Sequence, residues 1–404
     1  MALVKMRNVL WAALIAASLT GVIKYTEHAV ADKGASSSGS GSANSASSSS
    51  SPGSSAADWP SFRGNRTQTG VAASKLPDKL QERWKFQTDD GVESTAAIVG
   101  GVAYIGSYDE SVYAIDLKSG KKKWQYKAVK SNGFHAAPAV RDGRVYIGDS
   151  EGIFHCIDAD KGTKLWTFKT KGEIVSCANF AGDNVLFGSG DENLYCLSKD
   201  GKEQWSFRLA GGPVMASPAI VDGRTFVSGC DSTLHVIDIA TGKESASLEL
   251  GTQTGATPAV IDDSLYVGTM GTQFLAIDWK KPAMRWTFEA EDDAAPFLSS
   301  AAVTKKLVIV GSQDSIVYAI NRENGKQAWS FKTGGKVDSS PVIAGDRIYV
   351  GSVDKCLYVI DLEKGTQIQK IKLDGKIAGS PAVGEGCLVI GTDKGTVYCF
   401  AGDE

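Results

Sequence analysis

From residue 81 onward, apolar and polar residues alternate over short runs interrupted by glycine, aspartate and asparagine. Alternation with a period of two is typical of β-strands, and turn residues between such short runs indicate many strands rather than helices. The runs recur as one unit. Its clearest marker is an aromatic residue followed by two apolar residues and an aspartate, as in Tyr113–Asp116 and Tyr358–Asp361.

This unit occurs eight times, at intervals of 40 to 43 residues. About 40 residues holding four short strands is the size of one propeller blade. The pattern therefore predicts an all-β fold, an eight-bladed β-propeller of four-stranded antiparallel blades within residues 81–404. The eight units are marked by Tyr113, His155, Tyr195, His235, Leu275, Tyr318, Tyr358 and Tyr398.

The closure of the ring is also visible in the order of the strands. The last unit ends at Ala401, after its third strand, whereas a strand around Trp84 precedes the first unit. We expect this N-terminal strand to pair into the last blade, which removes the free edges of an open sheet.

A tryptophan follows most units at a fixed distance, and we expect its ring to dock on the neighbouring blade. When the units are aligned without gaps, Ala246 and Gln369 occupy the two remaining tryptophan positions. The blade junctions there should be weaker or covered by another group, and we propose that Trp59 and Phe62 cover one of them. Asp116 and Gly120 exemplify the turn inside each unit, because aspartate opens a turn and glycine supplies positive φ. The docking tryptophans are Trp84, Trp124, Trp166, Trp205, Trp286 and Trp329.

The segment before the repeats divides into three parts. Lys5 and Arg7 precede an apolar run of fifteen residues, shorter than the roughly 20 that span a membrane, which predicts a signal peptide or an N-terminal membrane anchor over residues 1–31. Residues 32–57 are rich in serine and glycine and predict a disordered linker. Residues 58–80 form a lead-in. We expect an exported protein of the periplasm or cell envelope, soluble or held close to the membrane by this anchor.

The composition excludes several classes of site. A net charge of −3 argues against nucleic-acid binding through bulk charge. None of the seven cysteines belongs to a CxxC motif or an adjacent pair, and none of the four histidines belongs to an HExxH motif. Cys156, Cys196 and Cys399 share one repeat position with alanine and valine, so we interpret them as small buried residues.

One repeat position should surround the mouth of the axial channel, three residues before the proline position of the Ser-Pro or Thr-Pro turn. Most of its eight members are apolar or small, and the next two positions are nearly all small, as crowding at the axis requires. Glu93, His135 and Asp338 are the candidate site residues, with solvated rim residues as the alternative interpretation. The eight are Glu93, His135, Val175, Met215, Gly255, Leu298, Asp338 and Ala378.

The run Asp116 to Trp124, with Gly120 and Lys121, resembles the tryptophan-docked repeat of the PQQ-like (pyrroloquinoline quinone) β-propeller family. The resemblance covers about residues 81–401, and it implies a fold more than a function. Similar proteins include quinoprotein dehydrogenases and non-catalytic envelope proteins such as outer-membrane protein assembly factor B. No catalytic, quinone or calcium ligand of the dehydrogenases can be matched here, so no cofactor is expected.

We therefore expect a non-enzymatic, monomeric propeller that binds another envelope protein as a scaffold, as in outer-membrane protein assembly. Two alternatives stay open. One is a dehydrogenase that uses pyrroloquinoline quinone and calcium, and the other is recognition of a small ligand or polysaccharide at the propeller axis.

Overall fold

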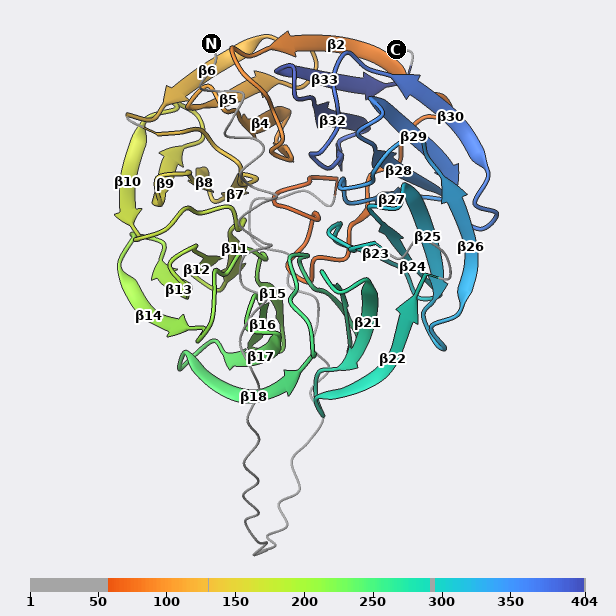
Figure 1. Ribbon diagram of the computed structural model, residues 1–404. Helices are drawn as coiled ribbons and strands as arrows, with labels where there is room; N and C mark the ends of the chain where they lie inside the picture. Colours follow the sequence, from red (N-terminus) through yellow and green to blue (C-terminus); the bar gives the residue numbers. More distant parts are fainter. Residues whose placement is uncertain (1–56, 130, 291–294, 403–404) are drawn as a thin grey trace, which may run out of the picture. The chain divides into compact units, whose positions relative to one another are not determined.

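A computed structural model describes residues 57–129, 131–290 and 295–402. The strands form eight sheets around one axis (Figure 1). Blade 1 consists of β3 (Ala97–Val99), β4 (Val102–Gly106), β5 (Ser111–Asp116) and β6 (Lys122–Lys127), which follow one another from the axis to the rim and pair antiparallel. The predicted eight-bladed, four-stranded antiparallel propeller is confirmed. The proposed signal peptide or anchor, and residues 32–56 of the proposed linker, lie outside the described residues.

Six further blades repeat the strand order of blade 1. Blades 2 to 7 are β7 (Ala139–Arg141), β8 (Arg144–Gly148), β9 (Ile153–Asp158), β10 (Lys164–Lys169); β11 (Asn179–Ala181), β12 (Asn184–Gly188), β13 (Asn193–Ser198), β14 (Glu203–Arg208); β15 (Ala219–Val221), β16 (Arg224–Ser228), β17 (Thr233–Asp238), β18 (Lys243–Glu249); β19 (Ala259–Ile261), β20 (Ser264–Gly268), β21 (Gln273–Asp278), β22 (Ala283–Glu289); β23 (Ala302–Val303), β24 (Leu307–Gly311), β25 (Ile316–Asn321), β26 (Gln327–Lys332); and β27 (Val342–Ala344), β28 (Arg347–Gly351), β29 (Cys356–Asp361), β30 (Gln367–Lys372).

Blade 8 joins the two ends of the propeller. It contains β31 (Ala382–Gly384), β32 (Cys387–Gly391) and β33 (Thr396–Ala401), with β2 (Gln81–Gln87) as its outermost strand. Strand β2 pairs antiparallel with β33, and its buried Trp84 and half-buried Phe86 face blade 1. The expected closure by the N-terminal strand is confirmed. No helix in the described part of the chain is long and apolar enough to cross a membrane.

The six predicted tryptophans join neighbouring blades. Each donates its indole N–H to a main-chain carbonyl of the next blade over 2.8–3.1 Å, as Trp84 does to Leu117. Each ring also lies against the turn glycine of that blade. A Cβ on Gly120 would come within 2.6 Å of the Trp84 ring, and Gly120 has a φ of 69°. Glycine is required here for its conformation and for its missing side chain.

The two junctions without tryptophan use other groups. Between blades 4 and 5, beside Ala246, the next blade supplies Trp279, whose ring lies 5.3 Å from that of Phe226, and the turn glycine is replaced by Pro282. Between blades 7 and 8, the Gln369 side chain exchanges two hydrogen bonds with the main chain of Leu80.

The lead-in follows a path that the repeats do not predict. Residues 57–74 run around the inside of the ring and contact the innermost part of one blade after another, in orange at the centre of Figure 1. Near the end of this path, β1 (Val71–Ala72) pairs parallel with β27. The main-chain hydrogen bonds link Ala57 to Glu385, Trp59 to Ile98, Pro60 to Val140, Arg66 to Ile220, Thr67 to Val260, Thr69 to Val303, and Gly70 to Ile343.

The proposal that Trp59 and Phe62 cap weak blade junctions is wrong. Trp59 is bonded to the innermost strand of blade 1, and Phe62 lines a cavity on the axis. Both residues belong to the segment that lies inside the ring, whereas Ala246 and Gln369 lie on the outermost strands.

Candidate functional site

A cavity of about 210 Å³ lies on the propeller axis. We call the eight residues predicted at the channel mouth the mouth ring, and the structure places all of them around this axial cavity. Each lies in the connection that leads into the innermost strand of its blade, as Glu93 does four residues before β3. The three candidates Glu93, His135 and Asp338 are therefore brought together, although whether they bind a ligand stays a prediction.

Below the mouth ring, a second ring of small residues lines the same cavity. The main-chain N–H of a member donates to the side chain of the member in the next blade, over 2.9–3.2 Å, at seven of the eight junctions. The hydrogen bond is missing between Thr95 and Ala137, because the side chain of alanine has no atom that could accept from the N–H of Thr95. This inner ring is Thr95, Ala137, Cys177, Ser217, Thr257, Ser300, Ser340 and Ser380.

The small residues near the axis thus have a second reason besides crowding. A hydroxyl, or the thiol of Cys177, accepts from the buried N–H of the preceding blade, where an unpaired group would cost about 1–3 kcal/mol. The inner ring therefore holds neighbouring blades in register around the cavity.

The lead-in contributes Phe62 to the lining of the cavity. The adjacent Arg63 is buried, and its guanidinium donates to the main-chain carbonyls of Ala301 over 3.1 Å, Ser340 over 3.2 Å, and Pro341. Burial lowers the pKa of Arg63 to about 9, while the three carbonyl oxygens favour its charged form. Arg63 thus connects the lead-in to blades 6 and 7.

The acidic side of the mouth is organised by an aromatic residue that the repeat pattern did not single out. The Tyr108 hydroxyl donates to the Glu93 carboxylate, and its ring lies 4.3 Å from that of His135. Burial, with the nearby charges of Asp393 and Asp338, raises the pKa of Glu93, and the Tyr108 hydrogen bond opposes this. Burial lowers the pKa of His135 to about 4, so its imidazole is neutral at pH 7.

Two blades from Glu93, with blade 8 between them, Asp338 accepts a hydrogen bond of 2.9 Å from the side-chain amide of Gln313. Neither carboxylate forms an ion pair with a lysine or arginine within residues 57–402, apart from the undescribed positions. Val175, Met215 and Leu298 form an apolar wall on blades 3, 4 and 6. The cavity therefore has an acidic side and an apolar side.

Tyr108 and Gln313 could have been found from the sequence. Both lie two residues after the glycine that ends the second strand of their blades, Gly106 and Gly311. Aligning this position across the repeats would have predicted another set of residues close to the mouth ring. Phe62 has no counterpart in the repeats, so no alignment of units could place it.

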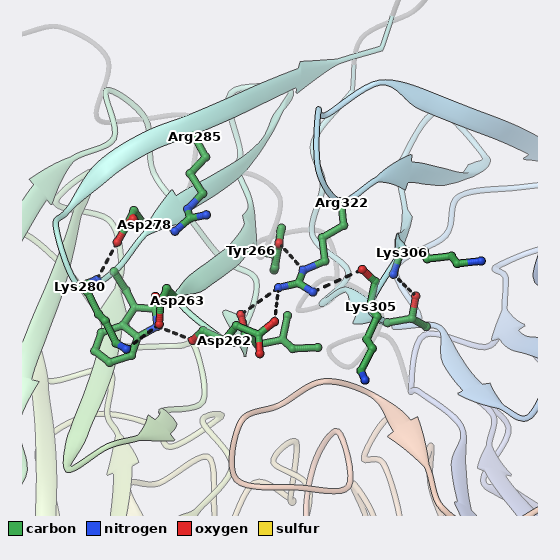
Figure 2. Close-up of polar contacts among 12 residues, drawn as sticks. Asp262, Asp263, Tyr266, Asp278, Lys280, Arg285, Lys305, Lys306 and Arg322 are labelled. Atoms are coloured by element: carbon green, nitrogen blue, oxygen red, sulfur yellow. Dashed lines mark hydrogen bonds and ion pairs between the residues drawn. The ribbon is translucent and has the colours of Figure 1, made fainter. Parts of the chain in front are cut away.

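A separate polar cluster lies at the junction of blades 5 and 6 (Figure 2). Arg322 donates to Asp262 over 2.6 Å and to the Tyr266 hydroxyl over 2.9 Å, and so connects the two blades. Lys280 pairs with Asp263 and Arg285 with Asp278, at 2.6 and 2.7 Å. Because these charges are paired between and within blades, we interpret the cluster as structural.

Metal binding has little support in the donor set. Among residues 57–129, 131–290 and 295–402, no group of three or more histidine, cysteine, aspartate or glutamate side chains could hold a metal ion. The cysteines described there are free, and Cys156, Cys196 and Cys399 are buried, as their repeat position predicts. In the described part of the chain, the axial cavity brings Glu93 and Asp338, neither of which forms an ion pair with a lysine or arginine, to the edge of an open space.

Comparison with protein families gives one match over all eight blades. The family model described as "Outer membrane protein assembly factor BamB" matches residues 71–179, 150–245 and 231–400. Among curated proteins, the chain is 32% identical over 287 residues to the serine/threonine-protein kinase AfsK of Streptomyces griseus, which covers 67% of this chain and 34% of the kinase. It is also 29% identical over 279 residues to outer membrane protein assembly factor BamB of Salmonella typhimurium, covering 65% and 69%. The chain thus spans about a third of the kinase.

Two solved structures illustrate the shared fold. BamB from Moraxella catarrhalis superposes with a TM-score of 0.68 at 21% identity, covering 81% of this chain and 98% of that one. Quinohemoprotein alcohol dehydrogenase from Comamonas testosteroni gives a TM-score of 0.74 at 13% identity, covering 86% and 81%. At these identities the likeness shows the propeller fold alone.

Proposed function

Because the chain belongs to the PQQ-like propeller family whose model is described as outer membrane protein assembly factor BamB, we propose that it is a protein–protein interaction scaffold of the cell envelope, acting in outer-membrane protein assembly. The observation that carries this proposal is the family match over residues 71–400, which includes every blade. The kinase relative shows that such a repeat also occurs within a longer protein of another kind.

The architecture supports binding rather than movement. Tryptophans or other groups join each blade to the next, and the lead-in is bonded to all the blades from inside the ring. A rigid ring of this kind holds its surface loops in fixed positions, where they can bind a partner without large ordering costs. Export belongs to the proposal, since the N-terminal segment that motivates it lies outside the described residues.

The second candidate is a quinoprotein dehydrogenase, favoured by the fold likeness and by the position of the cavity on the axis. The residues present do not fit the cofactor. Pyrroloquinoline quinone is itself a carboxylate anion and would meet Glu93 and Asp338, and calcium requires six to eight oxygen ligands. The volume of about 210 Å³ is also below the roughly 300–1,000 Å³ of most ligand pockets.

Site-specific photo-crosslinking of the full chain in its native cells tests the scaffold. A photoreactive residue would replace Glu151 or Glu192, on the face that carries the cavity mouth, and Lys161 or Lys202, on turns of the opposite face. The scaffold predicts a discrete cross-linked protein from the positions of one face and none from the other. If no position on either face yields a specific product, the proposal is overturned.

Calorimetric titration with pyrroloquinoline quinone, with and without calcium, tests the second candidate separately. Saturable, calcium-dependent binding with a stoichiometry near one would favour the dehydrogenase. If the folded protein gives no heat of binding, the dehydrogenase candidate is ruled out.

A further inference from the structure

The axial cavity combines features that define the charge and shape of a ligand. It is small, its mouth carries two carboxylates from blades 1 and 7, and Val175, Met215 and Leu298 form the apolar side. An occupant must therefore be short, partly aliphatic and able to satisfy negative charge. These features belong to the cavity itself, whether or not the chain is an assembly scaffold.

Among the described residues, neither Glu93 nor Asp338 forms an ion pair with a lysine or arginine. Their hydrogen-bond donors are the neutral groups of Tyr108 and Gln313. Asp393 adds a third negative charge near Glu93, and the positive charge of Lys376 partly offsets the effect of the two aspartates on Glu93. Like charges in a partly enclosed site repel one another more strongly than in open water. A cation bound between Glu93 and Asp338 would relieve this repulsion.

The donor pattern also excludes other ligand chemistries. The cavity lining contains no lysine or arginine, and the guanidinium of the nearby Arg63 is bonded to three carbonyl groups, so no lysine or arginine charge in the lining attracts an anion. Carboxylates from only two lining residues are too few for a calcium ion. Phe62, whose ring already lies 5.9 Å from the Arg63 guanidinium carbon, adds to the lining an aromatic surface of the kind that attracts ammonium and guanidinium groups.

We propose that the axial cavity is a binding site for one organic cation, an alkylammonium or guanidinium group on a short aliphatic stem. The cationic head lies between Glu93 and Asp338, and the stem lies against Met215 and Leu298. Either a free amine or a lysine or arginine side chain of another protein supplies this chemistry.

Calorimetric titration of the full chain distinguishes these ligands. The probes are Nα-acetyl-lysine N-methylamide, Nα-acetyl-arginine N-methylamide, the uncharged Nα-acetyl-norleucine N-methylamide, and the free amines butylamine and agmatine. We expect saturable binding of cationic probes at a stoichiometry near one, weakened by salt, and no binding of the norleucine compound. Preference for the capped amino acids assigns the source to a protein side chain, and preference for butylamine and agmatine assigns it to a free amine.

Three single variants assign the site. Glu93→Gln and Asp338→Asn each remove a charge with little change of shape and should weaken binding of the best probe about tenfold, which corresponds to about 1.4 kcal/mol. Glu151→Gln, on the same face but outside the cavity lining, is the matched control and should bind unchanged. Thermal unfolding of each variant shows whether the fold is retained.

Equal binding of the cationic and norleucine probes, full binding by both charge-removing variants, or no binding of any probe would overturn the proposal. Saturable binding of a neutral oligosaccharide that Glu93→Gln leaves unchanged would overturn it as well, because the site would then recognise hydroxyl groups. The cross-linking result is independent of these outcomes, so failure here leaves the scaffold proposal standing.

Discussion

The ring of Trp84 lies flat against Gly120, so the strand that closes blade 8 is held by a turn of blade 1. A Cβ at Gly120 would be 2.6 Å from the indole, and the indole N–H donates to Leu117 three residues earlier in the same turn. The same contact recurs between five other pairs of blades, such as Trp124 and Gly162. Blade 4 has Ala246 at the tryptophan position, and blade 5 has Pro282 at the position of the turn glycine. The tryptophan and the glycine that it contacts are therefore both absent at this junction.

Replacing Gly120 by alanine should destabilise the propeller more than the same change at Gly100. Gly100 also has positive φ, but a Cβ there would meet nothing within 4 Å. Alanine in the left-handed region costs roughly 1–2 kcal/mol, and overpacking against the tryptophan adds about 1–3 kcal/mol. The midpoints of urea denaturation of Gly120→Ala and Gly100→Ala measure this difference. Equal midpoints would show that the docking contact contributes little.

Ala137→Ser should complete the hydrogen-bonded inner ring. The new hydroxyl would accept from the N–H of Thr95, as Ser217 accepts from Cys177 over 3.0 Å, and stabilise the fold by about 0.5–1.5 kcal/mol. The reverse change, Ser217→Ala, should cost about 1–3 kcal/mol because it leaves a buried N–H unpaired. Thermal unfolding tests both predictions: the midpoint should rise for Ala137→Ser and fall for Ser217→Ala. If both variants unfold like the original protein, the inner ring does not hold the blades together.

Arg63→Ala should free the lead-in from blades 6 and 7. Hydrogen bonds to a charged group contribute about 1.5–3 kcal/mol each, so the loss of several should lower stability by at least about 3 kcal/mol. The exposed side chain of Arg66 is the control, and Arg66→Ala should stay within about 0.5 kcal/mol. Limited proteolysis should then cut within residues 57–80 of the Arg63 variant first. Unchanged resistance there would contradict the assigned role.

His135 should stay neutral down to about pH 4 in the folded protein. Its folded pKa lies below the usual 6.5, so the unfolded chain binds the proton first. Its contribution to stability is therefore present above pH 6.5 and is lost as the pH falls toward 4. Glu93 acts in the opposite direction, because its raised pKa makes protonation easier in the folded state. The imidazole NMR signals should show no titration of His135 between pH 8 and 5, and a midpoint near 6.5 would contradict this.

The difference between original protein and His135→Gln isolates the stability effect of His135, since both keep Glu93. Urea midpoints of the two should diverge most above pH 6.5 and converge toward pH 4. A difference that does not change with pH would assign His135 a packing role only.

The propeller could be predicted because each blade is a local unit of about 40 residues. The turn from Asp116 to Gly120 and the docking tryptophan recur in most units, and the missing fourth strand of the last unit predicted that β2 pairs with β33. The mouth ring followed from the same periodicity, because equivalent positions in a closed ring must surround one axis.

Only the tertiary structure placed the lead-in and the partners of the candidate residues. Arg63 bonds to residues 238 to 278 positions away, and nothing around it in the chain distinguishes it from a surface arginine. Tyr108 and Gln313 reach Glu93 and Asp338 from different connections, so their contacts depend on how neighbouring loops meet. The sequence by itself therefore determined the repeated blade and the closure of the ring, since these arise from local periodicity. Folding in three dimensions decided where the lead-in lies and which side chains bond to the mouth ring, because these depend on contacts between segments that the repeat does not encode.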